Sequence, residues 1–374
     1  MSHYDHIQEA IAITLLPNVG NKHAKNLIAH CGSPRAVFEE KKQNLLKIPG
    51  IGAHVVEGIT REKVMARAEK ELQYILKYSI KTHYYLDKSY PQRLRHCEDG
   101  PLVLFQLGSA DLNPNKALAV VGTRSATSYG EELTRQFCQD LAPYQPLLVS
   151  GMAYGIDITA HRGALENKIP TVGIVAHGLD RLYPQLHHKT ARQMIAEGGG
   201  LVTEFLTETN PDRENFPKRN RIIAGMCDAV VVVEAAKKGG ALITAQLANS
   251  YHREVFAFPG RVGDPFSEGC NNLIKSNQAC LINSVKDFEY LLNWKKNNNK
   301  VSPKSMQKEL FVELNEPEKK VVEALRAAGG EMALELLAMQ TEIPVNKILS
   351  HLMNLELHGL VNNKPGKIYA LQKF

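Results

Sequence analysis

The sequence predicts an α/β protein built around a doubly wound, mostly parallel β-sheet. Its 374 residues are enough for two or three domains. Within residues 96–295, short apolar runs alternate with amphipathic segments, and several runs have the continuous β-branched character of strands buried on both faces. This alternation is typical of a Rossmann-like sheet with helices on both faces. The predicted strands are Leu118–Val121, Leu147–Ser150, Thr171–Ala176, Leu201–Phe205, Ala229–Glu234 and Val255–Phe258.

The sheet domain is expected to span residues 81–294, and a polar linker is expected at residues 295–309. Between the strands, apolar side chains recur at helical spacing. The predicted helices are Glu131–Leu141, Ile156–Leu165, Leu186–Ala196, Arg219–Met226, Leu242–Tyr251 and Val285–Trp294.

Residues 1–80 are expected to form a small helical domain of the helix-hairpin-helix or SAM-like type. Two turns, Leu16–Gly20 and Ile48–Gly52, resemble the hairpins of that motif, although the first has Asn18 where glycine is usual. The free backbone N–H groups of such turns can hold a phosphate. A packing unit that does not touch nucleic acid explains the repeat equally well, so both interpretations stay open.

Residues 310–374 are expected to form a winged-helix domain. Helices are predicted at Ala333–Met339 and Val345–His358, followed by a hairpin over Gly359–Leu371. The helix that would read DNA carries Lys347 as its only lysine or arginine within 345–352, whereas a duplex reader usually offers more cations to phosphates. The pattern therefore favours a protein contact or a weak DNA contact for this domain.

Composition excludes several classes of protein. The chain is 44% hydrophobic and 22% charged, which excludes a disordered or fibrous protein. Its longest apolar runs, such as Ala229–Val233, are too short to cross a bilayer, and residues 1–10 carry no secretion signal. Six scattered cysteines without a C-x-x-C pair fit a reducing cytoplasm and argue against a cysteine zinc site. We therefore expect a cytoplasmic protein without a membrane segment, metal or cofactor.

The net charge of +6 is concentrated near the N-terminus, and residues 96–295 are close to electrical balance. An anion site in the middle of the chain would therefore depend on a focused cluster of cations. The chain has no triphosphate P-loop and no H-E-x-x-H motif, so a nucleoside triphosphate site or a zinc protease site is not expected.

The first candidate motif is Gly122-Thr123-Arg124-Ser125, directly after the first predicted strand. A dinucleotide-binding fold places its glycine-rich turn here, but Arg124 and Thr127 occupy positions where that turn needs glycine. A guanidinium at this place suits an exposed phosphate. The alternative is an ion pair between Arg124 and a carboxylate of the protein.

The second candidate motif follows the next strand and contains Ser150, Gly151, Gly155 and Asp157. His161 lies four residues after Asp157 and therefore on the same side of a helix. The two could form an acid/base pair. The favoured interpretation is structural: Asp157 complements the helix dipole and orients the histidine.

The third candidate motif crowds three cations near the start of a helix: Lys218, Arg219 and Arg221. The helix dipole disfavours positive charge there by roughly 0.3–1 kcal/mol for each exposed side chain. That placement favours a bound anion, and Phe216 beside it could stack a base. The alternative is neutralisation by nearby acids, namely Glu204, Glu208, Asp212 and Glu214.

A further loop, Lys237-Lys238-Gly239-Gly240, opens a helix and has the character of a phosphate-accepting turn. Together with Leu242–Ala245 and Phe258–Gly260, these motifs resemble the DNA-processing protein A (DprA/Smf) family over about residues 80–285. The sequence departs from that family at Gly240, where serine is frequent, and at His187, where asparagine is frequent.

The resemblance implies a non-enzymatic, homodimeric protein that binds single-stranded DNA, protects incoming strands and loads a RecA-type recombinase during natural transformation. It implies that Arg124 is the main phosphate contact and that the residues around Phe216 line the same pocket. The expected DNA-binding residues are Gly122, Arg124, Ser150, Gly151, Gly155, Phe216, Lys218, Arg219, Asn220, Arg221, Lys237, Lys238 and Gly240.

Two other functions remain to be weighed. A nucleotide-processing hydrolase of the phosphoribohydrolase type would use Asp157 and His161, although the P-G-G-x-G-T-x-x-E signature of those enzymes is absent. A duplex-binding regulator would use the winged helix as its reader.

Overall fold

The structure of the protein, a computed structural model, describes residues 3–296 and 314–372. Nine of its strands form one sheet in the order β1-β2-β6-β5-β4-β3-β7-β8-β9. From β6 to β9 all neighbouring strands are parallel, whereas β1 and β2 add antiparallel at one edge. The strands are β1 (Lys81–Tyr84), β2 (Val103–Gly108), β3 (Ala117–Val121), β4 (Leu147–Ser150), β5 (Thr171–Ile174), β6 (Gly200–Thr203), β7 (Ala229–Val232), β8 (Glu254–Ala257) and β9 (Cys280–Leu281).

The order of strands confirms the predicted doubly wound sheet. After β3 the chain moves outward through β4, β5 and β6, and it then returns to place β7 on the other side of β3. In open α/β sheets, ligands bind at the carboxyl ends of the strands where the order reverses. The fold therefore directs attention to the loops that follow β3 and β7.

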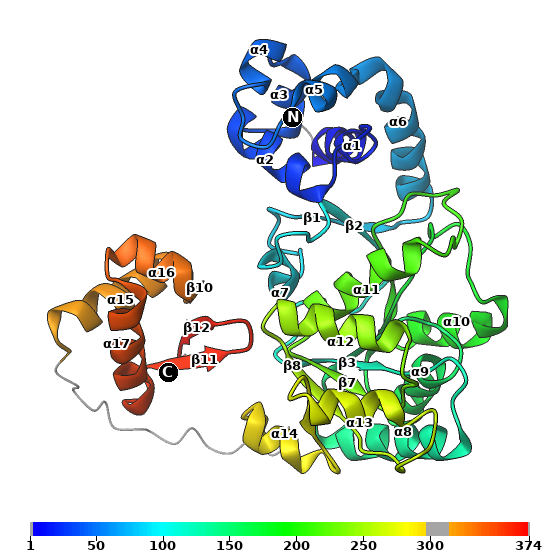
Figure 1. The fold of residues 1–374 in the computed structure, drawn as a ribbon. Coiled ribbons are helices and arrows are strands. Elements are labelled where there is room, and N and C mark those ends of the chain that lie inside the picture. The colour runs from blue at the N-terminus through cyan, green and yellow to red at the C-terminus, as the bar shows by residue number, and fades with distance from the viewer. Residues whose placement is uncertain (1–2, 297–313, 373–374) are drawn as a thin grey trace.

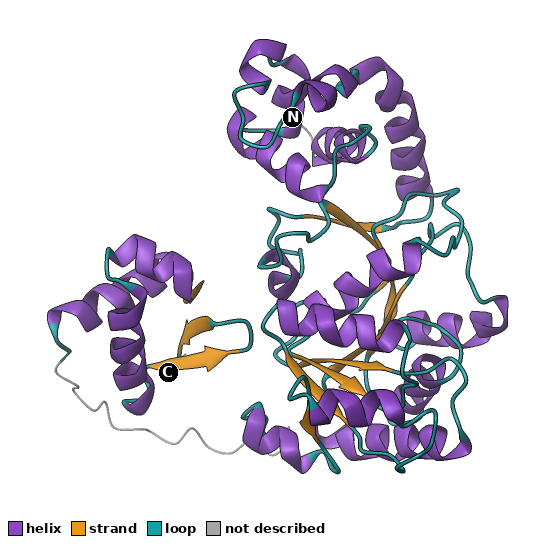
Figure 2. Cartoon of the chain, in the orientation of Figure 1, coloured by secondary structure: helices purple, strands orange, loops and turns teal. Residues whose placement is uncertain are grey.

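Helices cover both faces of this sheet (Figure 2). Alternate side chains of β3 enter two different cores. Ala119 and Val121 pack toward α11 (Asn215–Gly225) and α12 (Gly240–Ser250). Leu118 and Val120 pack toward α8 (Ser128–Leu141) and α9 (Ile156–Glu166). The helices are α7 (Gln92–Arg95), α8 (Ser128–Leu141), α9 (Ile156–Glu166), α10 (His188–Ala196), α11 (Asn215–Gly225), α12 (Gly240–Ser250), α13 (Glu268–Lys275) and α14 (Lys286–Leu291), with short 3₁₀ turns at Ala142–Tyr144 and Gln185–His187.

The N-terminal region is helical and packs on the edge of the sheet formed by β1 and β2 (Figure 1). Ile7, Leu27 and Val64 share a hydrophobic core with Leu102 and Phe105, so this region and the sheet edge are held together by apolar contacts. Its helices are α1 (His3–Thr14), α2 (Asn21–Cys31), α3 (Pro34–Glu39), α4 (Lys42–Leu45), α5 (Ala53–Gly58) and α6 (Arg61–Lys77).

The two predicted hairpin turns precede α2 and α5. Asn18, which replaces the usual glycine in the first turn, has a φ of 60°. Asparagine tolerates this left-handed conformation better than most residues, so the substitution is compatible with the turn.

The C-terminal region confirms the predicted winged helix. It contains α15 (Glu316–Ala327), β10 (Glu331–Ala333), α16 (Leu334–Thr341), α17 (Val345–Leu357), β11 (Val361–Lys364) and β12 (Ile368–Leu371). The turn between β11 and β12 contacts the sheet domain: Arg253 Nη1 donates to the Pro365 carbonyl (2.9 Å), and the Gly366 N–H donates to the His252 carbonyl (2.9 Å).

The structure does not test the predicted linker, and its first two strands were not expected. The predicted linker coincides largely with residues 297–313, which lie outside the described residues. β1 and β2 were not among the predicted strands, because a short apolar run such as that of β2 cannot be distinguished from a buried helix by periodicity alone. No helix in the described part of the chain combines the length and the apolar character that a membrane span needs.

Candidate nucleic-acid interface

An open cavity of about 990 Å³ lies at the carboxyl ends of β3 and β7, and we call it the switch-point cavity. Its walls come from the loop after β3, the first turns of α11, and the loop from β7 into α12. Of the residues expected to bind DNA, it is lined by Gly122, Arg124, Phe216, Arg219, Asn220, Lys237, Lys238 and Gly240. The fold thus gathers motifs from distant parts of the chain around one opening.

Hydrogen bonds fix the loop that carries Arg124. The Thr123 N–H donates to the Glu234 carbonyl (2.7 Å), and the Ile156 N–H donates to the Thr123 carbonyl (3.2 Å). The buried Glu234 carboxylate accepts from the N–H and the hydroxyl of Thr127, at 2.9 and 2.6 Å. The loops after β3 and β7 are therefore joined into one unit.

Arg124 is exposed and lies over the ring of Phe216. Its guanidinium carbon is 4.9 Å from the ring centroid, which is within cation–π range. In the described part of the chain, no carboxylate forms an ion pair with it. The alternative of an internal ion pair is therefore not realised, and the guanidinium remains available to a phosphate.

Helix α11 presents two faces to two different cavities. Phe216, Arg219 and Asn220 line the switch-point cavity, whereas Lys218 and Arg221 line a separate cavity of about 630 Å³ beside the N-terminal region. Residues three and four apart share a side of a helix, so the sequence cluster is divided by the helical period. The expectation that all three cations line one pocket with Phe216 is wrong.

Arg221 is held by an internal ion pair on the second face. Its Nη2 lies 2.5 Å from Glu204 Oε2, and both side chains are nearly buried. Glu204 also accepts from Asn21 Nδ2 (3.4 Å) in the N-terminal region. Lys218 Nζ lies 4.0 Å from a carboxylate oxygen of Glu214. Neutralisation by nearby acids, weighed above as an alternative, is therefore found for these two cations.

Arg219 faces the switch-point cavity but is only 3% exposed. Its Nη1 donates to the Gly151 carbonyl (2.6 Å) and to the Ile174 carbonyl. Burial lowers the pKa of Arg219 to about 10, and the charge of Asp157 opposes that shift. Arg219 thus ties α11 to the ends of β4 and β5 and forms part of the cavity floor.

Ser150, Gly151 and Gly155 support the cavity from below and do not line it. Ser150 Oγ donates to the Val120 carbonyl (2.6 Å). A Cβ at Gly151 would come within 2.4 Å of Arg219 Nη1, and at Gly155, where φ is +73°, within 2.2 Å of a backbone oxygen in the Arg124 loop. The two glycines are thus required by close packing, and the expected contact of these three residues with DNA stays a prediction.

Asp157 and His161 are both engaged in structural hydrogen bonds. Asp157 Oδ2 accepts from the N–H groups of Gly151 (3.1 Å) and Ala153 (3.4 Å), which closes the turn before α9. Burial raises the pKa of this carboxyl, and the charge of Arg219 opposes the rise.

The His161 ring is fully buried and lies 2.7 Å from Thr171 Oγ1, which itself donates to the Leu148 carbonyl. The histidine Nδ1–H is therefore the donor to Thr171. Burial lowers the pKa of His161 to about 3. The structural interpretation of this pair is supported, with Thr171 rather than Asp157 orienting the histidine.

The opposite wall of the cavity carries exposed cations and a helix start. Lys238 is exposed, and Lys237 is exposed although its Nζ lies 3.3 Å from a carboxylate oxygen of Glu268. Helix α12 begins at Gly240, so the N–H groups of its first turn are open to the cavity.

Three residues of the site were missed from the sequence. Arg213 is an exposed cation in the cavity wall, and Tyr183 provides an exposed ring at its rim. Glu234 holds the Arg124 loop in place. A single acid at the end of the otherwise apolar run Ala229–Val233 is the signal that could have identified Glu234.

Two family models match the chain. The model described as DNA recombination-mediator protein A matches residues 81–293, and the DprA winged helix domain matches residues 312–367. The chain is 36% identical over 293 residues to Protein Smf of Escherichia coli (strain K12), covering 76% of this chain and 75% of that protein. It is 37% identical over 222 residues to the DNA processing protein DprA of Streptococcus pneumoniae, covering 59% of this chain and 76% of that protein.

Solved structures give the same result. The X-ray structure of DprA from Streptococcus pneumoniae superimposes with a TM-score of 0.66 at 29% identity, covering 79% of this chain and 99% of that one. A structure of the Helicobacter pylori protein, described by its single-stranded DNA binding mode, superimposes with a TM-score of 0.52 at 29% identity, covering 58% and 97%. Since the family model spans more than half of the chain and the motifs meet at one cavity, the protein belongs to the DNA recombination-mediator protein A family.

Proposed function

We propose that the chain binds single-stranded DNA in the switch-point cavity. In the finer form of the proposal, the protein is a homodimeric, non-catalytic mediator in the cytoplasm. It protects incoming strands and delivers them to a RecA-type recombinase during natural transformation. Membership of the family and the description of the Helicobacter pylori relative support this assignment.

The observation that carries the proposal is the unpaired guanidinium of Arg124 over the ring of Phe216. A single strand offers a phosphate and the face of an unstacked base at neighbouring positions. In a duplex the base faces are covered by their stacked neighbours, so the ring of Phe216 has no base face to stack on. The pair thus suits a single strand better than a duplex.

The surroundings of this pair support a polyanion. Arg213, Lys237 and Lys238 line the same cavity, and the first turn of α12 adds backbone N–H groups. A protein that binds DNA without catalysis agrees with the structural hydrogen bonds that Asp157 and His161 form.

Fluorescence anisotropy with a single-stranded oligonucleotide, the matching duplex and a mononucleotide at two salt concentrations tests the proposal. The wild-type protein should prefer the single strand, and its affinity should fall as salt rises. We expect Arg124→Ala to lower the affinity by about tenfold to a hundredfold and to reduce the salt dependence by about one phosphate contact. The melting temperature should not change, because the side chain is exposed.

Arg192→Ala is the matched control, since Arg192 is an exposed arginine on α10 and lies outside the switch-point cavity. Equal affinity of wild type and Arg124→Ala would remove the site assignment. Release of nucleobase from the mononucleotide, lost in Asp157→Asn, would instead support the hydrolase. Loading of a RecA-type recombinase onto protein-coated single strands tests the finer proposal separately.

A further inference from the structure

A second cavity adjoins the switch-point cavity. It has a volume of about 550 Å³, and the two cavities share Tyr183 and Pro211 in their linings. Its other lining residues include Tyr154 and Leu186. Because the two cavities share these two residues, they are neighbours, and we call the second cavity the tyrosine trough.

The tyrosine trough presents aromatic rings to solvent. Tyr154 and Tyr183 are 41% and 44% exposed, respectively. The Tyr183 ring lies 6.1 Å from the ring of Phe216, so it continues the aromatic surface begun under Arg124. Tyr154 is supported from behind by the buried His187, whose ring meets it edge to face at 5.0 Å. Half-exposed rings that are held in place offer flat surfaces for stacking.

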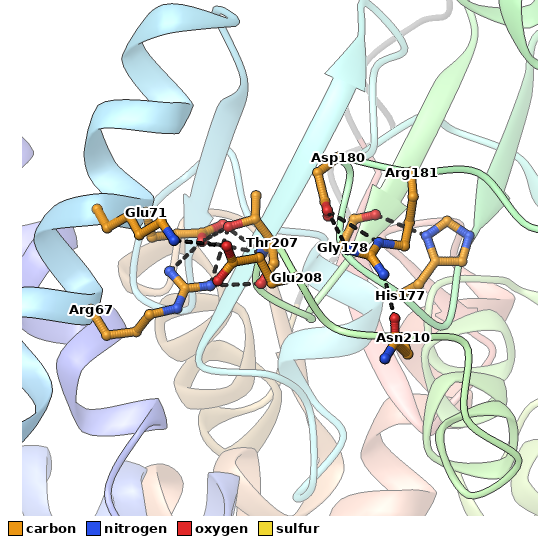
Figure 3. Close-up of polar contacts among 10 residues, drawn as sticks. Arg67, Glu71, His177, Gly178, Asp180, Arg181, Thr207, Glu208 and Asn210 are labelled. Carbon is orange, nitrogen blue, oxygen red and sulfur yellow. Dashed lines mark hydrogen bonds and ion pairs between the residues drawn. The ribbon is translucent and has the colours of Figure 1, made fainter.

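Polar contacts hold the loop that carries Tyr183, and Figure 3 shows those made by His177 and Arg181. The Tyr183 N–H donates to His177 Nε2 (3.1 Å), so the neutral His177 ring must carry its proton on Nδ1, which donates to the Gly178 carbonyl (2.8 Å). Arg181 donates to Asn210 in the loop that carries Pro211. The two walls of the trough are therefore tied to each other.

The wall that carries Pro211 is also fixed at its other end (Figure 3). Arg67 of α6 donates to the Thr207 carbonyl (2.6 Å), and the buried Glu71 accepts from the Thr207 hydroxyl (2.6 Å). The N-terminal region thus anchors the 204–211 loop on which one side of the trough depends.

The trough has little charge of its own. Arg181 is paired with Asp180 at 2.8 Å, so the two side chains largely cancel each other. In contrast, Arg124 and Lys238 of the switch-point cavity have no ion-pair partner among the described residues. The tyrosine trough is therefore suited to the uncharged, flat part of a ligand whose anionic part is bound in the switch-point cavity.

We propose that the tyrosine trough is a base-stacking subsite. A single strand anchored by a phosphate at Arg124 passes over Tyr183, and its next bases stack on Tyr183 and Tyr154. This inference rests on the proposed function and extends it to a second, less salt-dependent part of the site.

The test compares oligothymidylates of about 4 and about 12 nucleotides, the lower and upper parts of the range that one single-strand site covers. Anisotropy is measured for wild type, Tyr154→Ala, Tyr154→Phe and a control, Tyr290→Ala. Tyr154 lines only the trough, and Tyr290 on α14 is 88% exposed and lies outside both cavities.

We expect Tyr154→Ala to weaken binding of the longer strand by roughly 5-fold to 100-fold, with the salt dependence unchanged. Tyr154→Phe should bind like wild type, because it keeps the ring. Tyr154→Ala should bind the shorter strand as tightly as wild type does. Tyr290→Ala should bind both strands as tightly as wild type does.

Three results would overturn the inference while leaving the proposed function intact: equal affinity of Tyr154→Ala and wild type for the longer strand, equal weakening for both lengths, or a reduced salt dependence in this variant. Failure of the wild-type protein to bind either strand would instead overturn the proposed function itself.

Discussion

The two faces of α11 place similar arginines in different surroundings, one at the switch-point cavity and one at the boundary with the N-terminal region. On one side, Arg219 forms the floor of the switch-point cavity beneath the free guanidinium of Arg124. On the other side, Arg221 is paired with Glu204 at the boundary with the N-terminal region. The sequence gives both arginines the same neighbourhood, and the helical period separates them.

A cation is available to a ligand only when its own protein leaves it unpaired. Arg221 and Arg219 are both engaged by contacts within the fold, so their charges chiefly stabilise it. Among the residues that the structure describes, Arg124 has no such partner, and it lies over an aromatic ring instead. Three experiments test this distinction. The single tryptophan, Trp294, is buried against Phe288, so its fluorescence reports unfolding of the sheet domain.

The largest effect is expected for Arg219→Met. The substitution leaves the Gly151 carbonyl without its donor and Asp157 without its compensating charge, both in a buried place. Removal of one partner of a buried charge pair costs about 3–5 kcal/mol. Urea unfolding, followed by the fluorescence of Trp294, measures the loss of unfolding free energy, and Arg192→Met is the control. A stability equal to that of wild type would show that Arg219 is not a structural residue.

A smaller effect is expected on the second face. Arg221→Met and Glu204→Gln should each lower the free energy of unfolding by about 1–3 kcal/mol, because each leaves a nearly buried polar group unpaired. The double variant should lose less than the sum. Lys218→Met, whose partner is exposed and distant, should stay within about 0.5 kcal/mol of wild type.

The same variants test the division of labour between the faces. Affinity for single-stranded DNA should be retained in Arg221→Met. If it fell as far as in Arg124→Ala, the two faces would not be functionally distinct.

The third test uses acid. The pKa of His161 is about 3 in the folded protein and about 6.5 in an unfolded chain, because burial disfavours the charged ring and Arg219 adds to the effect. The unfolded chain therefore binds more protons between these values. Stability from this group is fully present above pH 6.5 and is lost as the pH falls toward 3, by at most about 1.4 kcal/mol per pH unit.

Unfolding in urea at several pH values measures this slope. His161→Gln keeps a hydrogen bond to Thr171 but has no proton to gain, so its stability should depend less steeply on pH over that range. Parallel curves for the two proteins would exclude His161 as the titrating group.

The sequence allowed the doubly wound sheet and the winged helix to be predicted, because β-branched runs and helical periods depend on local chemistry. The loops with Arg124 and Gly240 could be placed at the site for the same reason: both follow parallel strands directly. The pairing of Arg221 with Glu204 could not be predicted, since it depends on how α11 is rotated about its own axis after packing. Tyr183 was missed as part of the site because its loop reaches the cavity only through contacts with His177 and Asn210.

The carboxylate of Glu234 and the backbone bonds of Thr123 have one more consequence. They hold the rim of the cavity that faces the phosphate in its binding conformation before any polynucleotide binds. On binding, the flexible nucleotide chain then loses conformational entropy, whereas the polypeptide loses hardly any. Capture of a strand should accordingly proceed at the pace of electrostatically guided encounter, without a preceding slow rearrangement of the protein.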